Sequence, residues 1–576
     1  MLYAPQSIAQ SRPAPRAPLS FNRYYNYEEM TGALRTLVAA HPELLTMKSI
    51  GKSFQGRDLW LLTLNNPRTG PDREKTAMYI DGNIHGNEVQ AAEVVLYTAW
   101  YLAENYAKLP KITELVDTRA FYLLPMVNPD GRAYWFDQAN TAHSSRSGQK
   151  PVDDDGDGLF DEDPPDDLDG DGNIVQMRRL DPNGPMKISP DDPRLLIPVE
   201  PNDKYTGPRY TLLGMEGIDN DGDGRINEDG PGGYDLNRNW PAAWQPDNVQ
   251  FGAGDYPLSH PEARAIAEFI LDHPNIAAVQ AYHNAGGMIL RGPGAQYLGE
   301  YPRGDASVYE TLGRRGEKML PFYRYMITWR DLYTVHGGFI NWTFEELGIF
   351  SFTNELWSDL QMYHRRESPS MKERLEFNDY LLFGQGFVEW KPFKHPVYGD
   401  IEIGGTSRFG SRVNPGFMLE ETCHRNAAFT LYHADQMPLL EISDVEIKRL
   451  DGPGDPVLQI TVEVKNTRLI PTIAAIAARK NVGRRDRIEL AAAEGGRLEV
   501  LAGGTIDNRF TAPLRFVERR PERLWVDDGL RGESVRLFRW LVRGQGKASV
   551  TYHAQKGGRA TRTFDLSPTA ESRPSP

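Results

Sequence analysis

The chain contains almost no cysteine, no long apolar run, and fewer positive than negative charges. Its single cysteine, Cys423, excludes a disulfide within the chain and a thiolate zinc cluster. No stretch reaches the roughly 20 apolar residues that a membrane-spanning helix needs, so no membrane span is expected. Lysine and arginine total 65 against 79 aspartates and glutamates, which gives a net charge of −14. That balance argues against a nucleic-acid partner.

The length of the chain predicts two or three compact units, because 576 residues exceed a typical single domain. Residues 1–20 lack the apolar core of a signal peptide and predict a flexible tail. A catalytic domain is expected at 21–435, an accessory domain at 438–567 and a second tail at 568–576. Either the protein remains inside the cell or a signal has been removed, and a secreted or periplasmic location is the favoured hypothesis. A monomer is expected.

The two domains differ in hydrophobic pattern. Up to about residue 390, apolar strands alternate with amphipathic helices, as in 88–106 and 121–126. This alternation predicts an α/β fold with a mixed, mostly parallel twisted sheet flanked by helices. Beyond residue 438, segments such as 457–465, 509–516, 535–542 and 548–553 alternate apolar and polar residues. They predict an all-β sandwich.

Chemically versatile side chains follow four of the predicted strands. His85, Asn128, His283 and Glu355 each end or follow a strand. Open α/β sheets bind ligands where their strands end, so these side chains are expected on one rim. His85 and His283, with Glu88, match the three nitrogen and oxygen ligands of a catalytic zinc. A His-x-x-Glu pair alone is weak evidence, because an isolated histidine is more often structural.

Four further motifs, in order along the chain, strengthen that interpretation. They are Asn-Pro-Asp-Gly at 128–131, Gly-Tyr-Asp-Leu-Asn-Arg-Asn-Trp at 233–240, Tyr-Thr-Val-His-Gly-Gly at 333–338 and Phe-Thr-Asn-Glu-Leu at 352–356. With these motifs the chain resembles the zinc metallocarboxypeptidases of the carboxypeptidase A-like family, over roughly residues 22–390. The resemblance implies hydrolysis of the C-terminal bond of peptides or proteins.

The resemblance also implies a role for each matching residue. His85, Glu88 and His283 would bind one catalytic zinc, and Glu355 would act as the general base. Asn237 and Arg238 would bind the terminal carboxylate of the substrate, because a guanidinium meets a carboxylate with two parallel hydrogen bonds. Tyr333 would close over the bound residue.

Two positions depart from the family pattern. The family has an arginine after the Asn-Pro-Asp-Gly turn that stabilises the oxyanion, and Arg146 has about the right separation although its neighbours do not match. Asn87 stands where the carboxypeptidase A type has another arginine, which puts the binding of extended substrates in doubt.

The same alignment outlines a specificity pocket. Its expected lining is Leu290, Leu332, Val335, Ile340 and Thr353, with Gly294 leaving room. The absence of an acidic residue at 340 predicts release of an apolar or aromatic residue. Arg291, next to this lining, could instead admit an acidic side chain.

Three acidic runs between residues 147 and 230 predict two to three structural calcium sites, because alternating carboxylates before a turn glycine can surround a hard cation. The runs are Asp153, Asp155 and Asp157; Asp167, Asp169 and Asp171; and Asp219, Asp221 and Asp223. Asp161 and Asn227 stand at the next ligand positions of the first and third runs. A solvated acidic loop is the alternative.

Two other functions remain open from the sequence. A small-molecule deacylase of the same fold would lack the Asn-Arg and tyrosine motifs. A calcium-binding adhesion protein on an inactive peptidase scaffold would not need His85, Glu88, His283 and Glu355 together. The zinc carboxypeptidase is therefore the leading prediction.

Overall fold

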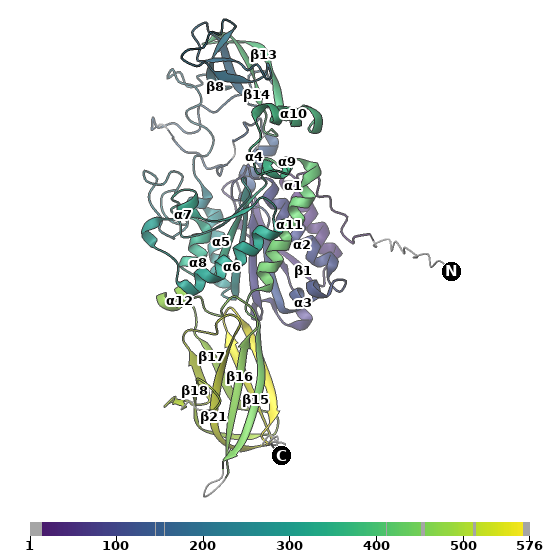
Figure 1. Cartoon of the computed structure of the whole chain (residues 1–576), viewed down its shortest axis with the longest axis vertical. Coiled ribbons are helices and arrows are strands. Elements are labelled where there is room, and N and C mark those ends of the chain that lie inside the picture. Colours follow the sequence, from purple (N-terminus) through teal and green to yellow (C-terminus); the bar gives the residue numbers. More distant parts are fainter. Residues whose placement is uncertain are drawn as a thin grey trace, which may run out of the picture.

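The computed structural model describes residues 14–143, 146–154, 156–410, 412–450, 456–510 and 514–567. Three bodies follow one another along the longest axis of the molecule (Figure 1). A central α/β body lies between a small β unit, which contains β8, β13 and β14, and a larger all-β domain that begins at β15.

An eight-stranded sheet forms the centre, in the order β1-β2-β4-β3-β9-β12-β10-β11. Its strands are β1 (Leu45–Lys52), β2 (Asp58–Leu64), β3 (Thr76–Gly82), β4 (Arg119–Leu124), β9 (Ile276–Asn284), β10 (Met288–Arg291), β11 (Arg324–Ile327) and β12 (Phe350–Leu356). The central neighbours β4, β3, β9 and β12 are parallel, whereas β1–β2, β2–β4 and β10–β12 are antiparallel. The predicted mixed α/β sheet is confirmed.

Helices cover both faces of this sheet because successive side chains of a strand point to opposite faces. Met78 and Ile80 of β3 join one hydrophobic core, and Ala77 and Tyr79 join another. The first core includes residues of α1 (Tyr27–Ala40), α2 (Gln90–Asn105), α3 (Pro110–Thr118), α6 (Arg303–Met319) and α11 (Gly416–Asp435). The second includes α5 (Pro261–Asp272) and α8 (Phe339–Glu345). Shorter helices are α4 (Pro129–Asp137), α7 (Thr328–Asp331), α9 (Asp359–Tyr363) and α10 (Met371–Leu381).

The small β unit is a six-stranded antiparallel sheet in the order β13-β14-β5-β8-β6-β7. It combines β5 (Gln176–Leu180), β6 (Met186–Ile188), β7 (Leu196–Pro198) and β8 (Arg209–Met215) of the acidic insertion with β13 (Phe387–His395) and β14 (Gly399–Thr406). Val175, Met177, Ile401 and Ile403 form its small core. The acidic runs predict an insertion here, but they do not predict a sheet that the insertion shares with β13 and β14.

The C-terminal domain has a five-stranded and a four-stranded sheet around one core that includes Phe538 and Trp540. Its elements are β15 (Leu440–Leu450), β16 (Val457–Asn466), α12 (Ala475–Lys480), β17 (Asp486–Ala492), β18 (Arg497–Ile506), β19 (Arg515–Phe516), β20 (Arg523–Val526), β21 (Ser534–Gln545), β22 (Lys547–Ala554) and β23 (Gly558–Asp565). All its strand pairs in the described residues are antiparallel. The strand expected at 509–516 is reduced to β19, and residues 511–513 lie outside the described part.

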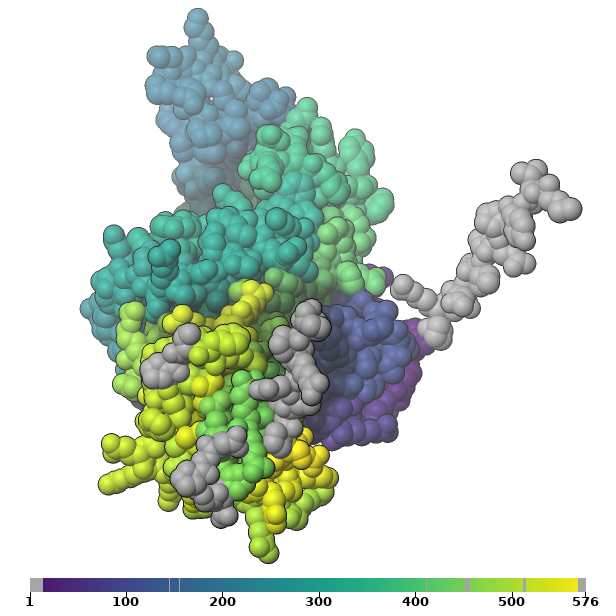
Figure 2. Space-filling model, turned by 60° about the horizontal axis from the view of Figure 1, so that its bottom comes forward, coloured from purple at the N-terminus to yellow at the C-terminus, as the bar shows by residue number. Residues whose placement is uncertain are grey.

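The C-terminal domain packs where the central strands begin, far from the rim where they end. The hydroxyl of Thr76, the first residue of β3, donates to the carbonyl of Pro438 at 3.4 Å. Arg119, the first residue of β4, donates to the carbonyl of Met437 at 2.7 Å. Figure 2 shows the yellow domain against the base of the central α/β body.

The predicted N-terminal tail is partly ordered. Residues 1–13 lie outside the described part, as does the predicted C-terminal tail at 568–576. Ala17, however, is fully buried, and its amide donates to Glu104 at 2.8 Å. Ala17 therefore packs on α2, within a segment for which a free tail was expected. Among the described residues, no helix is long and apolar enough to cross a membrane.

Candidate active site

A clamped turn after β3 carries the first two candidate ligands. Asn83 adopts a left-handed backbone conformation with φ of 60°, and its side-chain amide donates to the carbonyls of His85 and Gly86 at 2.7 and 3.1 Å. The fully buried Arg132 donates to the side-chain oxygen of Asn83 at 3.1 Å and pairs with Glu93 at 2.6 Å. The turn is thus held from inside the protein, which fixes the direction of its side chains.

His85, Glu88 and His283 converge as predicted. Nδ1 of His85 lies 2.9 Å from one carboxylate oxygen of Glu88, and Nδ1 of His283 lies 3.0 Å from the other. One ligand atom from each of the three residues lies within 4.8 Å of the others. All three side chains are buried. Two imidazole nitrogens and a carboxylate at one point form a donor set that fits zinc.

Asp235 supports this cluster from behind. Its carboxylate lies 3.0 Å from Nε2 of His85, which leaves Nδ1 of that ring free to face Glu88. Burial alone would raise the pKa of Asp235, but the nearby charges of His85, Arg146 and Arg238 hold it well below its usual value. Burial likewise raises the pKa of Glu88, and the imidazoles of His85 and His283 outweigh it, so that the pKa is lowered. Both carboxylates are therefore ionised at neutral pH.

Glu355 lies beside the cluster because of strand register. It is the direct partner of His283 in the parallel pairing of β12 with β9. Burial and the negative charge of Glu88 raise the pKa of Glu355 to about 7. A carboxyl group with such a pKa can accept and return a proton near neutral pH.

Arg146 reaches the same site. Its guanidinium donates to Asp235 at 3.0 Å and lies 3.5 Å from Glu88. It lines a cavity of about 270 Å³ together with the three candidate ligands and Glu355. Residues 144 and 145, which precede it, lie outside the described part.

Asn237, Arg238 and Tyr333 line the same cavity. The side chain of Asn237 accepts a hydrogen bond from the amide of Phe339 at 2.9 Å, and Arg238 donates to the carbonyl of Asn237 at 2.8 Å. Arg238 is buried, whereas Tyr333 is 56% exposed. The cavity therefore has a buried cation and an exposed aromatic ring in its lining.

Most residues of the predicted specificity pocket lie around one cavity, and its role in specificity stays a prediction. Leu290, Leu332, Val335, Ile340 and Thr353 all line the cavity. Gly294 does not provide room for a ligand, because a Cβ there would lie 2.2 Å from the side chain of Asn341. Arg291 is also not part of the lining. Its guanidinium is buried and donates to Tyr325 and to the carbonyl of Gly292, so it is not available to an acidic ligand.

The acidic insertion forms three clusters with oxygen atoms within 4.8 Å of one another. They are Asp157, Glu162 and Asp221; Asp167, Asp169 and Glu216; and Asp219, Asp221 and Asp223. Asp155 lies outside the described residues. The carboxylates of Asp153 and Asp171 accept hydrogen bonds from backbone amides of their own loops. The carboxylate of Asp161 accepts hydrogen bonds from the amides of Val152 and Gly232. The side-chain oxygen of Asn227 is buried without a hydrogen-bond partner in the described structure.

Three residues of these sites were not predicted from the sequence. Asp235 lies inside the 233–240 motif, so its acidity at that position was an available signal. Glu216 completes the second acidic cluster from the end of β8, and burial raises its pKa to about 7. Arg412 lies 3.5 Å from Glu88 and lines the cavity, although it is 57 residues beyond Glu355 and belongs to none of the motifs.

Comparisons with known proteins extend these observations. Residues 30–165 and 210–374, slightly more than half of the chain, match a family described as zinc carboxypeptidase. Residues 439–565 match a family described as a domain of unknown function.

Individual relatives cover shorter segments. A zinc carboxypeptidase of Saccharothrix mutabilis subsp. capreolus is 38% identical over 118 residues, which are 20% of this chain and 27% of that protein. Carboxypeptidase D of Homo sapiens is 32% identical over 121 residues, 21% of this chain and 9% of that protein. The matched segments thus span about a quarter or less of these relatives.

Two solved structures are similar at low identity. Carboxypeptidase A of Helicoverpa armigera has a TM-score of 0.45 and 17% identity, covering 74% of this chain and 76% of that one. Thrombin-activatable fibrinolysis inhibitor has a TM-score of 0.44 and 17% identity, covering 73% and 76% of the two chains.

Proposed function

The chain belongs to the zinc carboxypeptidase family, and from this premise we propose that it hydrolyses the C-terminal peptide bond of peptides or proteins. One observation carries the proposal. The cluster of His85, Glu88 and His283 shares a single cavity with the carboxylate of Glu355 and the guanidinium of Arg238. Such a cavity has a place for the reacting bond and another for a terminal carboxylate.

His85, Glu88 and His283 would hold the zinc ion. When bound, zinc polarises a carbonyl group and lowers the pKa of water. Asp235 orients His85 through Nε2, which favours the tautomer that directs Nδ1 to the metal.

The substrate would bind through its terminal carboxylate. Arg238 offers two parallel hydrogen bonds to that group, and Asn237 fixes the loop that carries it. The apolar side chains of Leu290, Val335 and Ile340 favour an apolar or aromatic C-terminal residue. Tyr333, at the mouth of the cavity, would cover the bound residue.

Glu355 would move the proton. It takes a proton from the attacking water as the water oxygen bonds to the scissile carbonyl carbon. It then gives that proton to the amine nitrogen as the carbon–nitrogen bond breaks. Arg146 would stabilise the negative charge that develops on the carbonyl oxygen.

We also propose that calcium binds the acidic insertion. Three oxygen clusters in one insertion support this, as does the buried, unpartnered side-chain oxygen of Asn227. Calcium sites of this kind suit a secreted or periplasmic enzyme, because calcium is abundant there.

Hydrolysis of a blocked dipeptide with a C-terminal phenylalanine tests the main proposal. The zinc-loaded wild type is expected to release phenylalanine. Glu355→Gln is expected to retain one zinc per chain and to lose at least about 10³-fold in kcat. A wild type with one zinc per chain that releases no residue from a panel of C-terminal residues would overturn the proposal and favour a binding protein.

A further inference from the structure

A second cavity of about 530 Å³ adjoins the candidate active site. Ala285 and Arg412 line both cavities, so the two are direct neighbours. The wall of the second cavity comes largely from α9, α10, the β13–β14 hairpin and the loop that follows it. About half of this wall follows residue 374, where the match to the zinc carboxypeptidase family ends.

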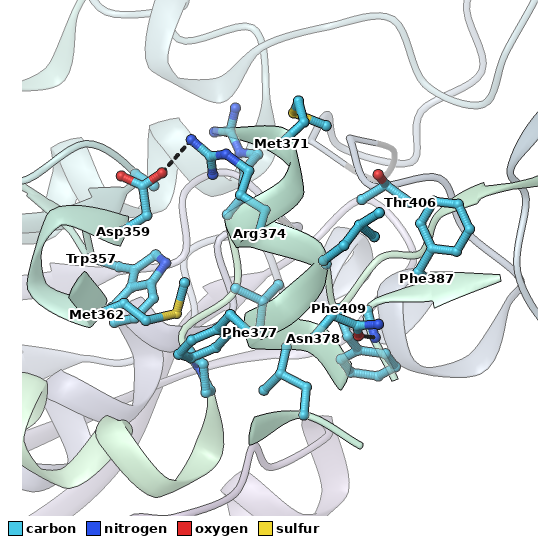
Figure 3. A pocket seen from close by; sticks show the side chains of 18 of the residues that line it. Trp357, Asp359, Met362, Met371, Arg374, Phe377, Asn378, Phe387, Thr406 and Phe409 are labelled. Atoms are coloured by element: carbon cyan, nitrogen blue, oxygen red, sulfur yellow. Dashed lines mark hydrogen bonds and ion pairs between the residues drawn. The ribbon is translucent and has the colours of Figure 1, made fainter. Parts of the chain in front are cut away.

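The lining is apolar and neutral. Figure 3 shows Trp357 and Met362 on one side of the cavity, Phe387 and Phe409 on the other, and α10 with Phe377 between them. Arg374 is neutralised by Asp359, whose carboxylate lies 2.5 Å away. Cavities of this size and composition hold apolar groups. Apart from Arg412, which lies where the two cavities meet, the charged side chains of this lining, Asp359 and Arg374, are paired with each other.

Arg412 stands between the two cavities in a fixed position. Its backbone has a φ of 58°, and its carbonyl accepts hydrogen bonds from the side chains of Gln90 and Asn284 at 3.0 and 3.1 Å. Its guanidinium donates to the carbonyl of Asn284 at 2.7 Å. The side chain as a whole is 32% exposed. Part of the guanidinium therefore remains accessible to another group.

Arg412 also compensates for the departure at position 87. Asn87 directs its amide to the carbonyl of His143 at 3.1 Å, and it does not line the cavity. Arg412, from a different part of the chain, lies 3.5 Å from Glu88 instead. It is the cation that a peptide meets on the path from Glu355 toward the second cavity.

We infer that the second cavity is a subsite for a bulky apolar side chain upstream of the scissile bond, and that Arg412 binds a backbone carbonyl of the substrate between the two cavities. This inference rests on the proposed carboxypeptidase function. It makes the enzyme selective for peptides that carry an aromatic or large aliphatic residue shortly before the released residue.

A peptide series tests the inference. Acetylated tetrapeptides with C-terminal phenylalanine carry either alanine at all three upstream positions or one phenylalanine at each position in turn. For one position, the wild-type enzyme is expected to have a kcat/KM for the phenylalanine peptide that is about tenfold or more above its kcat/KM for the alanine peptide, because an aromatic ring is removed from water. This quotient is the ratio that the variants below are compared by. A ratio near one at every position overturns the inference.

Two substitutions locate the effect. Ser368→Trp fills the cavity from an exposed position, and Met371→Asp places a charge in its lining at the first residue of α10, where a carboxylate favours the helix. Each is expected to reduce the ratio to below about threefold. The same substitution on the exposed surface of α6, Ser307→Trp, is the matched control and is expected to keep the wild-type ratio. A ratio that persists in both cavity variants overturns the assignment of the subsite.

Arg412→Gln tests the contact with the backbone. It is expected to raise KM for the tetrapeptides by about tenfold while kcat changes little, because binding before the reaction is lost. A lower kcat with unchanged KM would contradict the proposed contact. The blocked dipeptide separates the two proposals. If no peptide is hydrolysed, the proposed function fails and the subsite fails with it, whereas hydrolysis with flat ratios overturns the subsite alone.

Discussion

Asp235 connects three groups of the candidate site. Its carboxylate contacts His85 and Arg146 at 3.0 Å and accepts the amide of Asn237 at 2.7 Å. Asp235→Asn removes the negative charge but keeps the shape. Zinc affinity is expected to fall by about 10- to 100-fold, because the partner that orients a ligating histidine is weakened.

Competition with a zinc chelator measures that change in affinity. The exposed Asp255, whose nearest ion pair is Lys150 at 3.5 Å, provides a matched control. Asp255→Asn should leave zinc affinity unchanged. Equal affinities for wild type and Asp235→Asn would show that Asp235 does not orient His85.

Asp486 makes stability depend on pH in the C-terminal domain. It is fully buried, and Thr472 and Tyr552 donate to it at 2.5 and 3.0 Å. Burial raises its pKa to about 7, whereas the unfolded chain has a pKa of about 3.9. Between these values the folded state keeps a proton that the unfolded state has lost. Its contribution to stability is therefore present below pH 4 and is lost as pH rises to 7, by up to about 1.4 kcal/mol per pH unit.

Asp486→Asn removes this titration. Relative to wild type, the melting temperature of the variant is expected to rise steadily between pH 4 and pH 7 and to change little above pH 7.5. Differential scanning calorimetry of both proteins across that range measures the difference. A difference that does not vary with pH would mean that Asp486 is ionised in the folded protein.

Residues next to a motif could be predicted from the sequence, and residues that join a site from a distance could not. His85, Glu88, His283 and Glu355 follow buried strands, so their common rim was predictable. Arg412 and Glu216 reach their sites only through tertiary packing. Arg412 lies 57 residues beyond Glu355 in the chain, and Glu216 meets Asp167 and Asp169 across a small sheet. No local spacing encodes such contacts.

At the scale of elements, burial decided which strands could be predicted. Every residue of β3 and β9 is buried, and such apolar strands stand out in the sequence. β6 and β7 have only three residues each, and neither has a buried residue. Pairing with β8 and the β5–β14 contact stabilise that small sheet. β6 and β7 therefore carry no hydrophobic pattern from which they could be predicted.

Gly337 packs against the backbone of Arg238, the residue proposed to bind the terminal carboxylate of the substrate. Gly337 has a φ of +62°, and a Cβ there would lie 2.0 Å from the carbonyl oxygen of Arg238. Its carbonyl and amide pair with Trp240 and Ala242, both at 3.0 Å. Gly337→Ala must therefore displace Arg238. kcat/KM for the blocked dipeptide is expected to fall by at least about tenfold, mainly through KM.

Gly56→Ala is the control for backbone strain. Gly56 has a φ of +84°, and a Cβ there meets nothing within 4 Å. This variant should lose about 1 kcal/mol of stability from backbone strain alone and retain wild-type kinetics. If both variants keep the same KM, the close approach of Gly337 to Arg238 has no role in substrate binding.

At the scale of the whole molecule, the acidic insertion is tied to the site at both of its ends. Arg146 directly precedes it and Asp235 follows shortly after it, and these two residues pair at 3.0 Å. The ends also touch each other, because a Cβ on Gly232 would lie 1.8 Å from the carbonyl oxygen of Gly148. Disorder within the insertion would therefore reach the candidate site.

Removal of calcium with EGTA tests this link, provided that zinc is measured after the treatment and restored to one ion per chain, because EGTA also binds zinc. Without calcium, the carboxylates of the three clusters repel one another, and the insertion is expected to loosen. Limited proteolysis should then cut between residues 147 and 230, and kcat/KM should fall by about tenfold or more, with recovery when calcium returns. Asp221→Asn, which alters two clusters at once, should weaken calcium binding, whereas the distant Asp191→Asn should not. If EGTA removes bound calcium but leaves both proteolysis and kcat/KM unchanged, the insertion does not support the site.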